Sequence, residues 1–188
     1  MRMTTPSRGP DLTPASAVPP GGVSSACAGC GAILPEADGP THRYLESSAA
    51  CWSTYGEVLA REYGDPGLFR RVHRLTVDVY AVQHPGRPSA QAIQSVAVHL
   101  MSLCALLEGG SGAEGASKLI REGVRVKRRF VWLQPPQSMG PLTVADVGKA
   151  RGPAEHERAV RDWASSAWHA WAPHHATVRQ WCSDVRRA

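Results

Sequence analysis

Apolar residues recur at helical spacing through most of the chain after residue 52. The segment 89–108 is the clearest case, because its apolar residues lie three or four positions apart. They are Ile93, Val96, Ala97, Leu100, Cys104 and Leu107. Ser89 is typical of an N-cap, and Gly109 with Gly110 is typical of a helix end. This pattern predicts a helix over 89–108.

The same periodicity, interrupted by glycine and proline, predicts further helices. They cover 52–63, 68–83, 113–128, 153–171 and 173–186. The prolines within 130–143 predict an ordered loop or an extended crossing segment instead. No run of strands is visible. The predicted fold class is all-α, a helical bundle of four or more helices with a small irregular N-terminal zinc-binding module.

The chain divides by composition into three regions. Residues 1–25 are rich in proline and glycine and predict a disordered tail. Residues 26–52 show no helical period and predict the zinc-binding module, and residues 53–188 predict the bundle.

Length and composition exclude several classes of protein. The 188 residues are 43% hydrophobic and 20% charged, which is typical of a globular domain. No stretch approaches the roughly 18 apolar residues of a membrane span, and the amino terminus lacks the apolar core of a signal peptide. We therefore expect a cytoplasmic protein with no membrane partner. Its five cysteines then indicate thiols or metal ligands and not disulfides.

The first cysteines have the spacing of a metal site. Cys27 and Cys30 are two residues apart and precede Gly31, so that a turn can close around one ion. His42 and Cys51 complete the pattern C-x2-C-x11-H-x8-C. It predicts a structural zinc bound by Cys27, Cys30, His42 and Cys51. Free thiols and a redox dithiol are the alternatives.

Histidines on the predicted helices are candidates for chemistry. His73, Tyr80 and His84 share one face of the segment 68–83 and its end, and are candidate catalytic residues or surface groups. His99 borders the apolar stripe of its helix, and His174 and His175 open the last one. Imidazoles gathered inside a bundle can bind a divalent ion. His99, His174 and His175 are thus candidate ligands of a second divalent metal, and packing or hydrogen bonding is their alternative role.

The net charge of +5 is concentrated in one segment. Residues 118–129 hold six basic residues against Glu122, so the rest of the chain is nearly balanced. Only Phe130 and Trp132 follow as aromatic residues, whereas single-stranded nucleic acid is usually held by aromatic residues interleaved with basic ones. The pattern disfavours nucleic acid as a partner and leaves an anionic small-molecule substrate open.

Two resemblances to known families are visible. The first is close and covers residues 27–185, through the blocks CAGCGAILPEADGPTHRY, HRLTVDVYAVQHPG, QSVAVHL, RFVWLQPP and APHHATVRQW. They resemble an uncharacterised bacterial family of small CxxC-containing helical proteins, which implies no activity.

The second resemblance is distant. The segment SVAVHLMSLCALLE and the pattern HH-x3-V-x2-W starting at His174 are similar to DinB/YfiT-like metal-binding four-helix bundles. That likeness implies a divalent ion held by His99 and His175 and a thiol-dependent transferase or isomerase activity. The family's third ligand falls on Trp171, which departs from its pattern.

Two functions follow from these observations. The first is a cytosolic metalloprotein with a structural zinc and an inner histidine metal site, acting as a metal-dependent small-molecule transferase, isomerase or hydrolase. The alternative is a non-enzymatic, zinc-stabilised interaction module that binds a protein or nucleic-acid partner through its basic helix. The sequence decides neither between them nor the oligomeric state.

Overall fold

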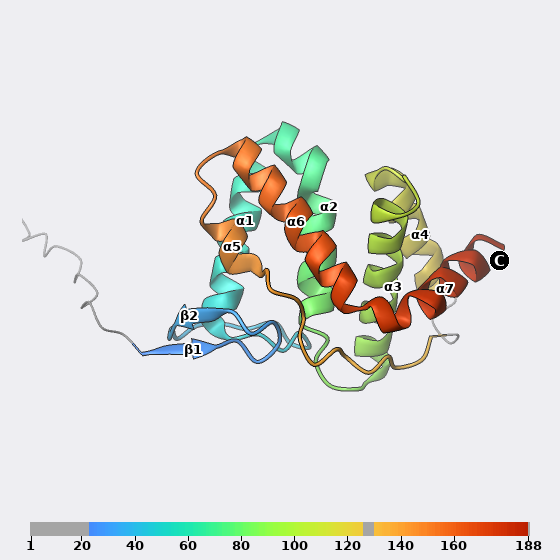
Figure 1. The fold of residues 1–188 in the computed structure, drawn as a ribbon, viewed down its shortest axis with the longest axis horizontal. Coiled ribbons are helices and arrows are strands. Elements are labelled where there is room, and N and C mark those ends of the chain that lie inside the picture. Colours follow the sequence, from blue (N-terminus) through green and yellow to red (C-terminus); the bar gives the residue numbers. More distant parts are fainter. Residues whose placement is uncertain (1–22, 126–129, 188) are drawn as a thin grey trace, which may run out of the picture.

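A computed structural model describes residues 23–125 and 130–187 of the chain, and its fold is helical (Figure 1). The elements are β1 (Ser24–Ala26), β2 (Ile33–Pro35), α1 (Ala49–Gly64), α2 (Pro66–Gln83), α3 (Ala90–Leu107), α4 (Ala113–Arg125), α5 (Val144–Gly148), α6 (Pro153–Ala170), the 3-10 turn η2 (Ala172–His174) and α7 (His175–Arg187). The predicted all-α class is confirmed.

Helix α2 lies at the centre of the bundle. It packs against α1, α3 and α6, while α3 also packs against α4 and α7 (Figure 1). The largest core side chains come from the C-terminal helices, where Trp163 and Trp171 are fully buried. The Trp163 indole N–H donates to Gln83 Oε1 at 2.8 Å, so the end of α2 is fixed against α6.

A single residue makes the sharp turn from α1 to α2. Asp65 ends α1, and its Oδ1 accepts hydrogen bonds from the amides of Gly67 and Leu68 at 2.9 and 3.0 Å. Pro66 occupies the first position of α2, where its missing N–H costs nothing. The two helices therefore run side by side from this turn.

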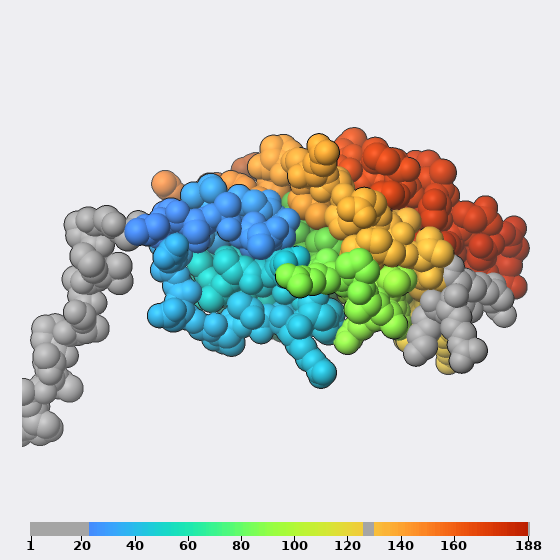
Figure 2. Space-filling view, turned by 90° about the horizontal axis from the view of Figure 1, so that it is seen from below, coloured from blue at the N-terminus to red at the C-terminus, as the bar shows by residue number. Residues whose placement is uncertain are grey.

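The N-terminal region contains a small sheet that the sequence did not predict. β1 and β2 pair antiparallel, with Ser24 opposite Pro35 and Ala26 opposite Ile33. Ser24 and Ser25, assigned above to the disordered tail, lie in β1; residues 1–22 of that tail lie outside the described residues. Figure 2 shows this segment in blue, lying across the region of α1 in cyan.

The remaining helix predictions are close to the observed bounds. Helix α4 begins at Ala113 as expected and is described to Arg125, because residues 126–129 lie outside the described residues. Val124 is 42% exposed, and Gly123 is the neighbouring residue that is buried. Helix α5 was missed, because its five residues are too few to show a helical period.

Contrary to the expectation that no stretch approaches a membrane span, helix α3 is long and apolar enough to cross a membrane, judged by length and composition only. An 18-residue window, Ala90–Leu107, has a mean hydropathy of 1.5. That window is 56% buried inside the bundle, and a core helix packed between α2, α4 and α7 passes the same test of length and composition.

Candidate metal centre

Cys27 and Cys30 lie in a tight turn between the two strands. The Gly31 amide donates to the Cys27 carbonyl at 2.8 Å, and the Cys27 amide donates to the Ala32 carbonyl at 2.9 Å. Gly31 has φ +76°, a left-handed conformation that residues with a Cβ rarely adopt. The turn therefore directs both sulfur atoms to the same side, toward the helices.

Cys51 enters the same space from the first turn of α1. Ser48 is the N-cap of that helix, and its hydroxyl accepts from the Cys51 amide at 3.2 Å. The Ser48 amide in turn donates to Cys27 Sγ at 3.4 Å. A helix N-terminus favours negative charge, so this position suits Cys51 to bind a cation as a thiolate.

His84 brings the fourth donor atom from the end of α2. Its Nδ1–H donates to the Tyr80 carbonyl at 2.7 Å, which leaves the lone pair on Nε2, the nitrogen that faces the sulfur atoms. Metal-binding histidines are commonly oriented by such a bond on the second nitrogen. Gly29 permits the approach, because a Cβ there would lie 2.5 Å from His84 Cδ2.

Three of the six distances between the four donor atoms are close to the edges of a tetrahedral zinc site. His84 Nε2 lies 3.5 Å from Cys27 Sγ and 3.4 Å from Cys51 Sγ. Cys30 Sγ lies 3.8 Å from Cys51 Sγ, and all four atoms lie within 4.8 Å of one another. Zn–S bonds of about 2.3 Å and Zn–N bonds of about 2.0–2.1 Å at tetrahedral angles give edges of about 3.8 Å (S to S) and 3.6 Å (S to N).

The centre is closed to solvent. Cys27 and Cys30 are 2% and 6% exposed, and Cys51 and His84 are fully buried. Tyr80 covers one side, with its hydroxyl donating to Cys51 Sγ at 3.6 Å and its ring stacked on that of His84. A set of four protein ligands fills a tetrahedron and leaves no position for a substrate.

The thiols influence one another's ionisation strongly. Hydrogen bonds from Cys30 and Cys51 hold the pKa of Cys27 far below its usual range. The same contacts, with Cys27 and Cys30 as partners, raise the pKa of Cys51. Without an ion the cluster therefore concentrates negative charge on one sulfur, and a bound cation would remove the remaining thiol protons.

The structure places His42, the expected fourth ligand, outside the centre. Its ring makes an edge contact with Tyr44 at 4.4 Å and a tilted contact with Trp52 at 5.1 Å. Burial lowers its pKa. His84 takes the ligand position in its stead, so the candidate set is corrected to Cys27, Cys30, Cys51 and His84.

The three candidate catalytic residues on the α2 face have separate roles. His84 faces the sulfur atoms, and Tyr80 covers the centre and stacks on Tyr55 at 3.8 Å between ring centroids. His73 lies at the other end of the helix, where its Nδ1–H donates to Glu62. The structure therefore does not gather them into one catalytic site.

The candidate ligands of a second metal also lie apart. His99 donates to Asp78 at 2.7 Å, a carboxylate fully buried between α2 and α3. His174 donates to the Gln134 carbonyl, and His175 donates to the Trp168 carbonyl while stacking on its ring. Within residues 23–125 and 130–187, the cysteine cluster is the one group of three or more candidate ligands that converges.

Sequence reasoning missed His84 as a ligand although a signal was present. His84 directly precedes Pro85 and Gly86, which end the helix, and it follows Tyr80 by one helical turn. A histidine at such a position has its side chain at the exposed end of a helix, where a preceding loop can reach it. Spacing along the chain favoured His42, because His42 is nearer in sequence to the three cysteines than His84 is.

Comparison with known proteins gives one match. Residues 25–172 match the model of a family described as a family of unknown function, DUF5946. No curated protein and no solved structure matches the chain, and the likeness to DinB/YfiT-like bundles thus has no support from either comparison.

Proposed function

The chain belongs to the DUF5946 family of unknown function, and we propose that it holds one zinc ion in a closed Cys3His centre with a structural role. The observation that carries the proposal is the convergence of four donor atoms within 4.8 Å of one another, with three of their six separations within about 0.2 Å of the edges of a zinc tetrahedron. Family membership alone assigns no activity.

The donor atoms favour zinc over other divalent ions. Three thiolates and one imidazole are soft or borderline ligands, which suit zinc or iron–sulfur chemistry better than magnesium, calcium or manganese. The four atoms lie within 4.8 Å of one another, which fits one ion. His84 also donates a hydrogen bond from Nδ1, the ring nitrogen that does not face the sulfur atoms, as zinc-binding histidines commonly do.

The centre would join three separate parts of the chain. The turn between β1 and β2 supplies two sulfur atoms, α1 supplies the third, and α2 supplies the imidazole. An ion bound there holds the exposed hairpin against the ends of two core helices. Because all four positions belong to the protein, the ion stabilises the fold and does not activate a substrate.

Metal analysis of the purified full chain tests this proposal. We expect one zinc per chain by elemental analysis, retained on dialysis and released by a strong chelator. Cys30→Ser and His84→Ala should each reduce the stoichiometry well below one. His42→Ala is the matched control, because His42 is near the module but outside the four donor atoms.

Three results would contradict the proposal. They are less than half an equivalent of any metal in protein purified with zinc present, loss of zinc in His42→Ala, and full retention in His84→Ala. Iron in place of zinc would keep the site but change the cofactor.

A cytoplasmic location fits the same chemistry. All five cysteines are free, and Cys104 and Cys182 are buried thiols away from the centre. Free thiols persist in reducing compartments, so we assign the protein to the cytoplasm. Fractionation of cells that express the full chain tests this assignment.

A second candidate function is an interaction module, and the exposed face of α4 favours it. Lys118, Arg121 and Arg125 are exposed there, and Lys118 has only a distant partner in Glu122 at 3.8 Å. A partner with an acidic surface fits this face. Binding that weakens steeply with salt and is lost in Arg121→Ala and Arg125→Ala would support it.

A further inference from the structure

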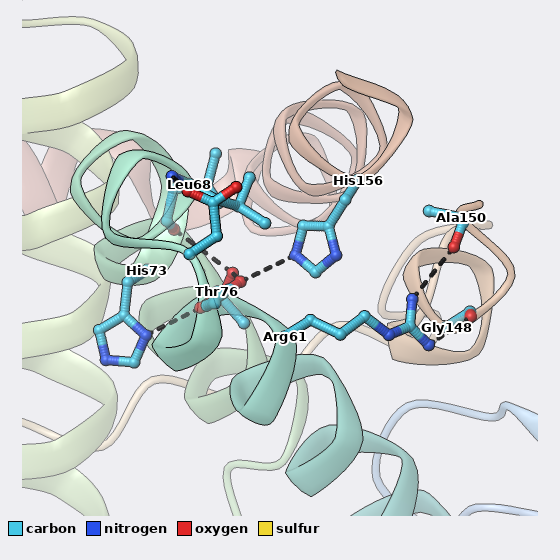
Figure 3. Close-up of polar contacts among 10 residues, drawn as sticks. Arg61, Leu68, His73, Thr76, Gly148, Ala150 and His156 are labelled. Atoms are coloured by element: carbon cyan, nitrogen blue, oxygen red, sulfur yellow. Dashed lines mark hydrogen bonds and ion pairs between the residues drawn. The ribbon is translucent and has the colours of Figure 1, made fainter. Parts of the chain in front are cut away.

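A buried carboxylate links α1, α2 and α6 away from the metal centre, and the protein supplies its partners. Glu62 is fully buried. Thr76 and His156 donate to its Oε1, and His73 donates to its Oε2 (Figure 3). These contacts account for the burial of the charge by joining three helices. A second buried cluster, between α3 and α7, has chemistry that packing does not require.

The second cluster consists of two cysteines from different helices. Cys104 of α3 and Cys182 of α7 are 7% and 5% exposed, and both are free thiols. The Cys182 thiol donates to the carbonyl oxygen of Met101 at 3.7 Å, one helical turn before Cys104. The two thiol groups also interact directly. The pair is therefore a dithiol assembled by the packing of α7 on α3.

A charged clamp fixes the two helices at this level. Arg179 lies one turn before Cys182 and donates from Nε and Nη2 to Glu108 at 2.7 and 2.8 Å. Glu108 also accepts from the Trp168 indole N–H at 3.1 Å and lies 3.7 Å from the Cys104 sulfur. The clamp holds α7 against the end of α3, so that the two cysteines stay together.

A cavity of about 370 Å³ gives access to the pair from solvent. Its walls include Cys104, Glu108, Arg179, Cys182, Arg186 and Arg187. The three arginines are exposed, so the mouth of the cavity is basic. A small solute can reach the sulfur atoms through this opening, although most of each cysteine side chain is buried.

The surroundings give the two thiols different ionisation. The hydrogen bond with Cys182 lowers the pKa of Cys104, and the Arg179 guanidinium acts in the same direction, against burial and Glu108. The same contact, with burial, raises the pKa of Cys182. One sulfur is thus favoured as a nucleophile, and the other remains a thiol beside it. Redox-sensing cysteines commonly have this arrangement of a low-pKa thiol and a second cysteine.

We propose that Cys104 and Cys182 are a peroxide-reactive pair that closes to a disulfide between α3 and α7. First, the Cys104 thiolate attacks one oxygen of hydrogen peroxide. An S–O bond forms, the O–O bond breaks, and the released hydroxide takes a proton from solvent to become water. Second, the Cys182 sulfur attacks the Cys104 sulfur. The S–S bond forms, the S–O bond breaks, and the leaving hydroxide takes the Cys182 proton to become water.

The electrons balance within this sequence. The two sulfur atoms together lose two electrons, and the peroxide is reduced to two molecules of water. The product joins α7 covalently to α3, and exchange with a small thiol returns the pair to its reduced form. In a reducing compartment such a bond is transient. The pair lies apart from the proposed zinc centre and uses none of its ligands.

Peptide mapping of the zinc-loaded full chain tests the proposal. The protein is treated with a small excess of hydrogen peroxide, blocked with N-ethylmaleimide and digested with trypsin without reduction. We expect the peptide that contains Cys104 to be linked to the peptide that contains Cys182 as the main disulfide product. Its mass should be that of the two peptides less two hydrogen atoms. Dithiothreitol should separate them.

A matched pair of variants identifies the attacking sulfur. In Cys182→Ser the second step is blocked, so Cys104 should stop as a sulfenic acid, which dimedone labels. In Cys104→Ser the remaining Cys182 has a raised pKa, and its dimedone labelling should be about tenfold lower. Serine replaces only the sulfur atom, and circular dichroism checks that both variants fold.

Three results would overturn the proposal. They are both cysteines remaining open to alkylation after peroxide, either cysteine joining mainly to Cys27, Cys30 or Cys51, and equal dimedone labelling of the two variants. The wild-type mapping needs no substitution, so it decides the first two results even if a variant does not fold. Zinc content is measured on the same sample. Failure of the dithiol pair therefore leaves the zinc centre standing, and an absence of zinc leaves the pair standing.

Discussion

The hairpin end of the molecule and the helical bundle are held together by different means. In the hairpin, every residue of β1 is exposed, and Ile33 of β2 is 68% exposed. The turn buries mainly Cys27, Cys30 and Ala32. The bundle instead buries whole tryptophans and a continuous set of aliphatic side chains between α2, α3 and α6.

This difference agrees with the proposal that the hairpin and the bundle have separate sources of stability. A region of about 25 residues cannot bury enough apolar surface to fix itself, and small modules commonly use a metal instead. The bundle is large enough to be stable through packing. The hairpin should therefore depend on the ion, and the bundle should depend on its core.

Removal of the metal should separate the two regions most strongly. In the chelated protein, or in Cys30→Ser, we expect the amides of Cys27 and Gly31 to lose hydrogen-exchange protection, because their turn is no longer held. Structural zinc sites contribute on the order of 10 kcal/mol in small modules. Amides of α3 should stay protected. Equal loss of protection in α3 would show that the bundle needs the ion as well.

Truncation of the core should have the opposite pattern. Trp163→Ala removes a fully buried ring and the hydrogen bond to Gln83. We expect a loss of about 3–5 kcal/mol in the free energy of unfolding, measured in urea. The folded fraction should still hold its zinc. Trp163→Phe is the control, since it keeps most of the ring and should lose less. Zinc loss at low urea in Trp163→Ala would contradict the idea that the metal centre and the helical core are stabilised separately.

Two helix caps offer a smaller, matched comparison. Ser48 caps α1 and Ser89 caps α3, and each hydroxyl accepts from an amide three residues on, at 3.2 and 3.1 Å. Ser48→Ala and Ser89→Ala should each cost about 1 kcal/mol of stability. Only Ser48→Ala should also weaken zinc affinity, measured against a chelator, because its helix presents Cys51. Equal zinc affinity in the two variants would mean that the cap does not position the ligand.

The smallest expected effect is a pH dependence at the far end of the bundle. The Arg179 guanidinium, with Trp168, lowers the pKa of Glu108 from 4.5 to about 2. Because the folded-state pKa is depressed, this stability is present above pH 4.5 and is lost as the pH falls toward 2. The pair is largely exposed, so we expect less than about 1 kcal/mol. Glu108→Gln should remove this part of the acid dependence, and an unchanged acid profile would contradict it.

The helical bundle was predictable because its signals are local. Apolar spacing and the Pro85–Gly86 and Gly109–Gly110 interruptions set the bounds of α2 and α3 to within two or three residues. The strands were missed because each has three residues, too few for alternation to be visible. In the helices the local sequence pattern and the local structure coincide, so periodicity was sufficient to predict them.

The sites depend on contacts that periodicity does not contain. Cys27 and Cys30 were recognised because their spacing is local, but the imidazole comes from His84, 57 residues after Cys27. Glu62 shows the same limit, because a charged residue on a helix is expected at the surface. Its burial follows from His73 and His156, and the latter is 94 residues away. Such pairings are decided by how α1, α2 and α6 pack.

The long separation of the donors also determines when the metal centre can form during synthesis. Three sulfur ligands are complete once Cys51 has been made, but the imidazole follows 33 residues later. At about 5–20 residues per second, the ribosome needs roughly 2–7 s to reach it. Through that interval a nascent chain carries three thiols with no fourth ligand. If the centre holds zinc as proposed, the ion would gain its fourth ligand only after His84 has been made, and the early chain would depend on a reducing environment to keep its sulfur available.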